Sequence, residues 1–246
     1  SPSTAALEPG SAVSPTAITM PSPSPTTAPA VDRNPAAYVE DLPYVVSVDP
    51  ADFVAVADNP YWPLAAGTTT VLEGDGERIV VEVTDYSKVI LGVTTTVVRD
   101  RAYEDGRLIE DTLDWYAQDR WGNVWYFGEE TTEYENGTPV STAGSWEAGV
   151  DGARPGIVML AQPHVGDVYR NEYYVGEAED LSKVIALDGT LTVPLGAFEA
   201  TVTTEDWTPL EPSQLERKVY APGVGLIAEG PVDDPLAIEL VEFRKP

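Results

Sequence analysis

The sequence predicts an all-β, mainly antiparallel fold, because strand patterns recur along it, tight-turn pairs separate them, and helix signals are scarce. Residues 78–84 alternate around Ile79, Val81 and Val83, as expected of a strand with one buried face. Asn-Gly and Asp-Gly pairs supply the positive φ angles that tight hairpin turns need. Short strands at such regular intervals predict a sandwich, a barrel or a strongly curled sheet, and they leave open whether the sheet closes.

The same pattern places the other elements. Strands are expected at residues 78–84, 89–98, 107–118, 123–135, 167–175, 183–193, 197–206, 215–221, 224–229 and 236–243, with the second ending before Arg99-Asp100. Turns are expected at 73–76, 105–106, 136–137, 188–189 and 223–225. Only residues 49–58 and 212–217 are typical of one or two short helical turns.

The most informative predicted hairpin covers residues 114–128. A loop at 120–122, with Gly122 left-handed, closes on Asp119 and Asn123 and so sets Tyr116 opposite Tyr126. Because side chains alternate, one face is predicted to be core: Trp115, Ala117, Trp125 and Phe127. The other face is expected to meet solvent or to line a cleft: Asp114, Tyr116, Gln118, Val124 and Tyr126.

The first thirty residues predict an extended tether rather than a folded segment. Seven Pro, six Ser, five Thr and six Ala fill this stretch, and Glu8 is its one charge. Such a composition has too few large apolar groups to offset the entropy of the chain. We therefore expect a disordered tether at 1–34 and a single antiparallel β domain at 35–246. Tethers of this kind are typical of exported bacterial proteins, so an extracellular or cell-surface location is expected, and a lipid anchor before Ser1 is compatible with it.

Composition excludes several classes of function. There are 41 Asp and Glu against 14 Lys and Arg, a net charge of −27, with no Cys and a single His. Without Cys there is no disulfide framework, thiol nucleophile or Cys-based metal site, and one His cannot build a multi-His site. The negative charge opposes binding to nucleic acid or to anionic membranes. No apolar run approaches the roughly 20 residues that span a bilayer.

The middle of the chain is rich in carboxylates and aromatic residues, which is one route to chemistry. Two carboxylates across a cleft can act as acid and base in glycoside hydrolysis, and aromatic rings can stack on sugars. The carboxylates to test for such a hydrolase are Asp119, Glu129 and Glu147. The alternative is that these acids are solvated residues on exposed strand faces.

Calcium is a second use for these acids, because hard cations take several oxygen ligands. The loop around Gly106 lacks the EF-hand pattern, since Thr112 stands where a bidentate Glu is needed. Asp100, Glu104 and Asp105 could still form an irregular site. The alternative is a solvated acidic turn, so no cofactor is required by the sequence.

A binding site is the third interpretation. Residues 145–156 are rich in Gly and predict a long irregular loop, the kind of segment in which binding residues concentrate. The lone His164 lies in another loop, and no Gly-x-Ser-x-Gly elbow accompanies it, which argues against a Ser–His–acid triad. The predicted ligand-binding residues combine the 145–156 loop with the polar hairpin face: Asp114, Tyr116, Gln118, Tyr126, Trp146 and Arg154.

Four ordered segments carry a family resemblance: residues 61–74, 193–198, 218–227 and, as the signature of a subgroup, 110–129. Together they resemble a broad group of uncharacterised bacterial exported proteins and lipoproteins. The resemblance covers about residues 58–246 and implies a curled sheet similar to the half-barrel of lipoprotein carriers. It transfers no catalytic residue, because the family has none assigned.

These inferences predict a non-enzymatic exported protein that binds a hydrophobic or amphipathic ligand, or an extracellular protein, on the concave face of its sheet. The alternatives are the carbohydrate-active hydrolase and a calcium-stabilised surface protein.

Overall fold

The computed structural model describes residues 34–39, 42–234 and 236–246, all of which lie in one compact unit, Asp32–Pro246. The predicted tether, apart from Asn34, lies outside the described residues. The described chain is built from strands, with one short 3-10 helix. It contains no helix long and apolar enough to cross a membrane.

The described elements follow one another along the chain as one short 3-10 helix and fifteen strands. They are η1 (Pro50–Asp52), β1 (Thr69–Gly74), β2 (Glu77–Ile90), β3 (Val93–Glu104), β4 (Arg107–Gln118), β5 (Val124–Glu135), β6 (Thr138–Ser141), β7 (Trp146–Glu147), β8 (Arg154–Met159), β9 (Val168–Arg170), β10 (Glu172–Tyr173), β11 (Leu181–Val193), β12 (Gly196–Trp207), β13 (Leu215–Ala221), β14 (Gly225–Pro231) and β15 (Ile238–Arg244).

All the described strands belong to one antiparallel sheet of the order β10-β8-β5-β4-β3-β2-β1-β15-β14-β13-β12-β11-β9, and β6 and β7 pair with β5 beside this path. The two ends of this order, β9 and β10, are separated in the chain by Asn171 alone. The Asn171 side chain donates to the carbonyl of Ile157 on β8 (3.3 Å) and accepts from Ser182 on β11 (3.0 Å). The sheet therefore curls until its edges approach, but no ladder closes it into a barrel.

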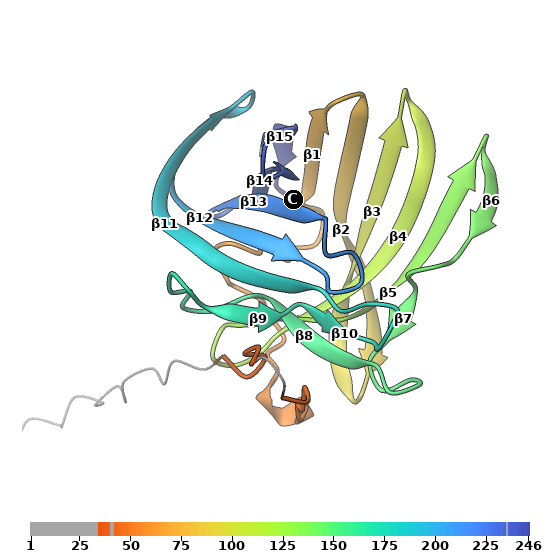
Figure 1. The fold of residues 1–246 in the computed structure, drawn as a ribbon, viewed down its shortest axis with the longest axis vertical. Helices are drawn as coiled ribbons and strands as arrows, with labels where there is room; N and C mark the ends of the chain where they lie inside the picture. The colour runs from red at the N-terminus through yellow and green to blue at the C-terminus, as the bar shows by residue number, and fades with distance from the viewer. Residues whose placement is uncertain (1–33, 40–41, 235) are drawn as a thin grey trace, which may run out of the picture. The chain divides into compact units, whose positions relative to one another are not determined.

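The curl places β11–β13 across from β2–β5, with β8–β10 below them in the view of Figure 1. The side chains of the long strands alternate between the two faces of the sheet, and the buried ones form two hydrophobic clusters. The larger cluster is rich in aromatic residues and lies at the end where β4, β5 and β8 pair. The smaller one gathers around Leu72, Ile227 and Leu240.

The all-β prediction is confirmed, and the expected strands at 107–118, 123–135, 183–193, 197–206, 215–221, 224–229 and 236–243 match β4, β5 and β11–β15 closely. The single strand expected at 89–98 is wrong. Leu91 and Gly92 adopt positive φ angles of 51° and 81° and form a turn between β2 and β3. The sequence did not predict this turn because Leu91 is apolar. After the turn, β3 continues through Asp100 to Glu104.

Three further expectations fail for local reasons. Asp188-Gly189 forms a bulge inside β11 instead of a turn, with Gly189 packed so tightly on Thr201 that a Cβ would lie 2.5 Å from its hydroxyl. The helix expected at 212–217 is wrong, because β13 begins at Leu215. The strand expected at 167–175 is interrupted at Asn171, and β1, β6, β7 and β8 were not anticipated.

The hairpin of β4 and β5 has the predicted loop: Asp119 and Asn123 pair, and Gly122 is left-handed with φ 99°. Tyr116 lies opposite Tyr126 as expected. The register then shifts, so that Asp114 pairs with Glu129 and β5 carries an extra residue at Phe127-Gly128. This bulge decides which face Glu129 occupies.

Candidate functional site

Two cavities fill the interior of the curled sheet and share one wall. The first cavity, of about 240 Å³, has an apolar floor that includes Leu72, Ile79, Val81, Val83 and Leu226. The second cavity, of about 230 Å³, is lined by acids, among them Glu129, Glu172, Asp180 and Asp206. The residues common to both are Trp62, Tyr116, Lys218 and Tyr220. The first cavity is therefore mainly apolar, although Asp100, Asp114 and Glu229 also line it, and the second is richer in acids.

A continuous series of aromatic rings runs along the shared wall. Tyr116 and Tyr126 stack with ring centroids 4.9 Å apart, and Trp146 meets Tyr126 edge-on at 5.4 Å. Trp62 packs edge-on against Tyr116 at 5.3 Å and lies 5.9 Å from Tyr220. Aromatic faces carry partial negative charge, so the wall is polarised as well as apolar.

Trp62 reaches the interior from the segment before β1, which is anchored through the two residues just before the indole. Gly223 N–H donates to the Pro60 carbonyl (2.6 Å), and the Tyr61 hydroxyl donates to the Ala200 carbonyl (3.0 Å). These contacts hold the segment against β12 and the β13–β14 turn. Trp62 is thus fixed by contacts distant in sequence.

The β5 bulge places Glu129 beside Asp114 on the interior face. In a regular strand Glu129 would follow Trp125 and Phe127 onto the outer face, and the extra residue reverses this parity. Gly128 permits the bulge: its φ is 127°, and a Cβ there would lie 2.2 Å from the Trp146 carbonyl oxygen. The Tyr126 hydroxyl donates a 2.6 Å hydrogen bond to Asp114 Oδ1.

Three interior acids on neighbouring strands have strongly raised pKa values. Burial, followed by the charge of Asp100, raises the pKa of Asp114 to about 7, although the Tyr126 hydrogen bond opposes the rise. Burial and the Asp114 charge raise the pKa of Glu129 to about 7. Burial and the charge of Glu229 raise the pKa of Asp100 to about 7 as well. Each of these acids makes its neighbours harder to ionise.

Glu172 is the most isolated of the interior acids. It is 8% exposed, lines the second cavity, and forms no ion pair or geometrically complete hydrogen bond within the described residues. Burial, with the charges of Asp180 and Glu129, raises the pKa of Glu172 well above the usual value. Hydrogen bonding with the nearby Trp146 indole offsets a part of this rise. That indole is itself buried, and its N–H has no complete hydrogen bond among the described residues.

Lys218 is the one cationic side chain among the described residues lining the two cavities. It lies 3.6 Å from Asp206 and 3.9 Å from Glu229, so it neutralises the β12–β14 side of the interior. Burial lowers the pKa of Lys218, but the charges of Asp206, Glu229, Tyr220 and Glu216 together raise it by more. Its side chain is 28% exposed, so solvent reaches the interior. The opposite wall, with Asp114, Glu129 and Glu172, has no such cation.

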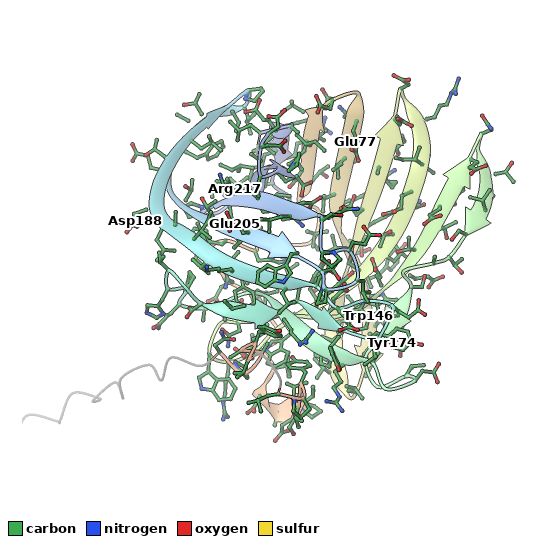
Figure 2. All side chains as sticks on the ribbon, viewed as in Figure 1. Glu77, Trp146, Tyr174, Asp188, Glu205 and Arg217 are labelled. Atoms are coloured by element: carbon green, nitrogen blue, oxygen red, sulfur yellow. The ribbon has the colours of Figure 1, made fainter. Side chains whose placement is uncertain are left out.

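Other cations pair with acids outside the cavities. Arg217 meets Glu205 at 2.8 Å on neighbouring strands, and Figure 2 shows the two together on β13 and β12. Arg99 similarly holds Asp111 at 2.6 Å. These two outer acids are paired with Arg, whereas Lys218 is the one cation beside the acids that line the cavities in the described residues.

The structure separates the three carboxylates expected for a hydrolase. Asp119 is buried in the β4–β5 loop, and its carboxylate accepts four hydrogen bonds, from Trp121 N, Asn123 N, Asn123 Nδ2 and Trp125 Nε1. Glu147 forms an ion pair with Lys88 (2.8 Å), which in turn covers the Trp115 ring on the outer face. Glu129 alone of the three lines the interior.

The predicted binding residues divide in the same way. Asp114, Tyr116 and Tyr126 line the cavities, and Trp146 supports Tyr126 from near β7 and β10 (Figures 1 and 2). Gln118 instead accepts from Asp58 N and Asn59 N, both at 2.8 Å, and anchors that segment. Arg154 lies at the start of β8 over the Tyr173 ring, at 5.9 Å.

The predicted calcium ligands also lie apart in the fold. Asp100 faces the first cavity, whereas Asp105 is a turn residue with φ 49° between β3 and β4 and Glu104 ends β3. Across the described residues, no group of three or more Asp, Glu or His side chains is placed to hold a metal ion. Calcium at these residues stays a prediction.

Sequence reasoning missed several interior residues: Trp62, Glu172, Tyr220 and Lys218. They come from distant parts of the chain, and only the curl of the sheet brings them together. One signal was available for Lys218, since it alternates with Glu216 and Tyr220 on β13. Strand alternation alone does not reveal which face becomes the interior.

Comparisons with known proteins add little. No protein-family model and no curated protein matches the sequence. Among solved structures, one similar chain is that of "a putative lipoprotein from Parabacteroides distasonis ATCC 8503". It matches with a TM-score of 0.40 and 13% identity, over 76% of this chain and 99% of that chain. This likeness assigns neither a family nor a function, and the predicted family resemblance stays a prediction.

Proposed function

We propose that this protein is an exported, non-enzymatic binding protein that holds a small amphipathic ligand inside its curled sheet. One observation carries the proposal: two interior cavities share the wall of Trp62, Tyr116, Lys218 and Tyr220, the first mainly apolar and the second richer in acids. Together the two cavities reach the size range of small-molecule sites.

The division of the interior supports an amphipathic ligand over a purely apolar one. An alkyl or ring group fits the floor around Leu72, Val81 and Val83, where burial of apolar surface is favourable. A polar group reaches the second cavity, where acids provide the acceptors. Such a ligand would contact the aromatic residues that the two cavities share, Trp62, Tyr116 and Tyr220.

The location follows from composition. The Pro-, Ser-, Thr- and Ala-rich first thirty residues support an exported protein. The absence of cysteine is compatible with any cellular compartment, so it gives no information on location. Three alternatives stay predictions: an extracellular protein as partner, a calcium-stabilised role and a carbohydrate-active role. The separation of Asp119, Glu129 and Glu147 gives no support to the carbohydrate-active role.

Native mass spectrometry of the full chain purified from its own host tests the proposal. We expect an additional small-molecule mass that organic extraction removes. The Val81→Phe variant should lose it, because the new ring fills the first cavity. Val80→Phe is the matched control, since Val80 is the next residue on β2 and faces the other side of the sheet.

Thermal unfolding of both variants establishes that they fold. A bare chain in every preparation would refute the proposal, and so would a bound molecule that the Val81→Phe protein retains as fully as the Val80→Phe protein.

A further inference from the structure

We propose that the ligand is an organic cation, an ammonium or guanidinium group attached to an apolar body, with the charged group seated between Tyr126, Glu129 and Glu172. This inference rests on the proposed function and names its ligand class. It depends on three features of the interior: unbalanced charge, a buried acid with open acceptor sites and the aromatic wall.

The charge of the interior is unbalanced on one side only. Lys218 reaches Asp206 and Glu229 at 3.6 and 3.9 Å and leaves the opposite wall without a cation. On that wall Asp114, Glu129 and Glu172 repel one another, which favours their neutral forms. A bound cation would relieve this repulsion and add attraction, whereas an anion would increase it.

The second feature is independent of the number of acids. Glu172 is 8% exposed, lines the cavity without an ion pair in the described part of the chain, and has the Trp146 indole as its hydrogen-bonding neighbour. An ionised carboxylate has about four acceptor sites, so a single indole donor leaves most of them open. Buried polar groups in native proteins nearly always have partners, so the open sites favour a ligand that brings a further donor.

The aromatic wall selects an organic cation over a bare metal ion. Tyr126 and Tyr116 stack at 4.9 Å and line the same cavity as Glu129 and Glu172. Ring faces attract ammonium and guanidinium groups within about 6 Å of the ring centre. No set of three acidic or imidazole ligands in the described residues is arranged for a metal ion.

Three probes with the same alkyl chain test the inference by calorimetry on the extracted full chain at pH 8: octyltrimethylammonium, octyl glucoside and octyl sulfate. Each is used below the concentration at which it forms micelles. We expect octyltrimethylammonium to bind at least tenfold more tightly than the other two. Glu129→Gln and Glu172→Gln should each weaken its binding about tenfold, the fold-change of one lost charge–charge contact of about 1.4 kcal/mol.

Glu130→Gln is the matched control, because Glu130 follows Glu129 on β5 but lines a groove on the outer face. Its affinity for octyltrimethylammonium should stay within twofold of the original chain. An equal loss in this variant would show surface ion pairing and overturn the inference.

The remaining outcomes separate this inference from the proposed function. If all three probes bind equally, the cavity is amphipathic, and the proposed function stands while the cation inference is overturned. If none binds and the chain from its host is bare, both are overturned. The comparison of probes on the original chain needs no variant, so a substitution that fails to fold does not weaken the test.

Discussion

Replacement of Asp114 with asparagine should flatten the pH dependence of stability. Asp114 is buried, and its folded-state pKa of about 7 lies well above the usual value of 3.8. A carboxyl whose pKa is raised on folding favours the folded state fully below pH 4, and this contribution is lost as the pH rises through 7. Asparagine stays neutral at every pH and can still accept the Tyr126 hydrogen bond at Oδ1.

The size of the effect follows from the change in pKa. A rise from 3.8 to about 7, at 1.36 kcal/mol per pKa unit, gives a ceiling of roughly 4 kcal/mol for the whole transition. The part between pH 5 and pH 8 is roughly 2 to 3 kcal/mol. Asp100 and Glu129 share the repulsion, so some of the slope remains in the variant.

Urea unfolding at pH 5, 6, 7 and 8 measures the effect as the change in unfolding free energy of the variant relative to the original chain. The asparagine variant should gain on the original chain as the pH rises, whereas Glu130→Gln should run parallel to it. The explanation fails if Asp114→Asn and the original chain lose stability in parallel between pH 5 and pH 8.

Three further changes probe the architecture around the site. Asp119→Ala removes an acceptor of four hydrogen bonds and should cost about 3 kcal/mol in urea unfolding; a loss below about 1 kcal/mol would contradict its structural role. Gly128→Ala meets a backbone oxygen at 2.2 Å and should cost more than about 3 kcal/mol, against about 1 kcal/mol for the unobstructed Gly137→Ala; equal losses would argue against the close contact. Tyr126→Phe removes the donor to Asp114, so the pKa of that carboxyl, followed by ¹³C NMR, should rise by about 0.5 to 1, and an unchanged pKa would show that the hydrogen bond is absent in solution.

The structure of the β4–β5 hairpin follows from its sequence only in part. The loop at Gly122 and the pairing of Tyr116 with Tyr126 follow from turn chemistry, and both are present. The position of Glu129 does not follow, because one extra residue at Gly128 reverses the face of every residue after it. A glycine is compatible with either a regular strand or a bulge, and the choice depends on the backbone of Trp146, which is distant in sequence.

The same bulge places Glu129 among the acids of the interior. A regular β5 would have turned Glu129 outward, where acids such as Asp111 pair with Arg side chains. The bulge instead adds a carboxylate beside Asp114, where burial and the Asp114 charge raise the pKa of Glu129, and this lowers stability at neutral pH. Departures from local consistency that reduce stability concentrate at functional sites. A ligand that supplies positive charge would restore the lost stability on binding, so the acidic interior is better explained as half of a complementary pair than as a structural core.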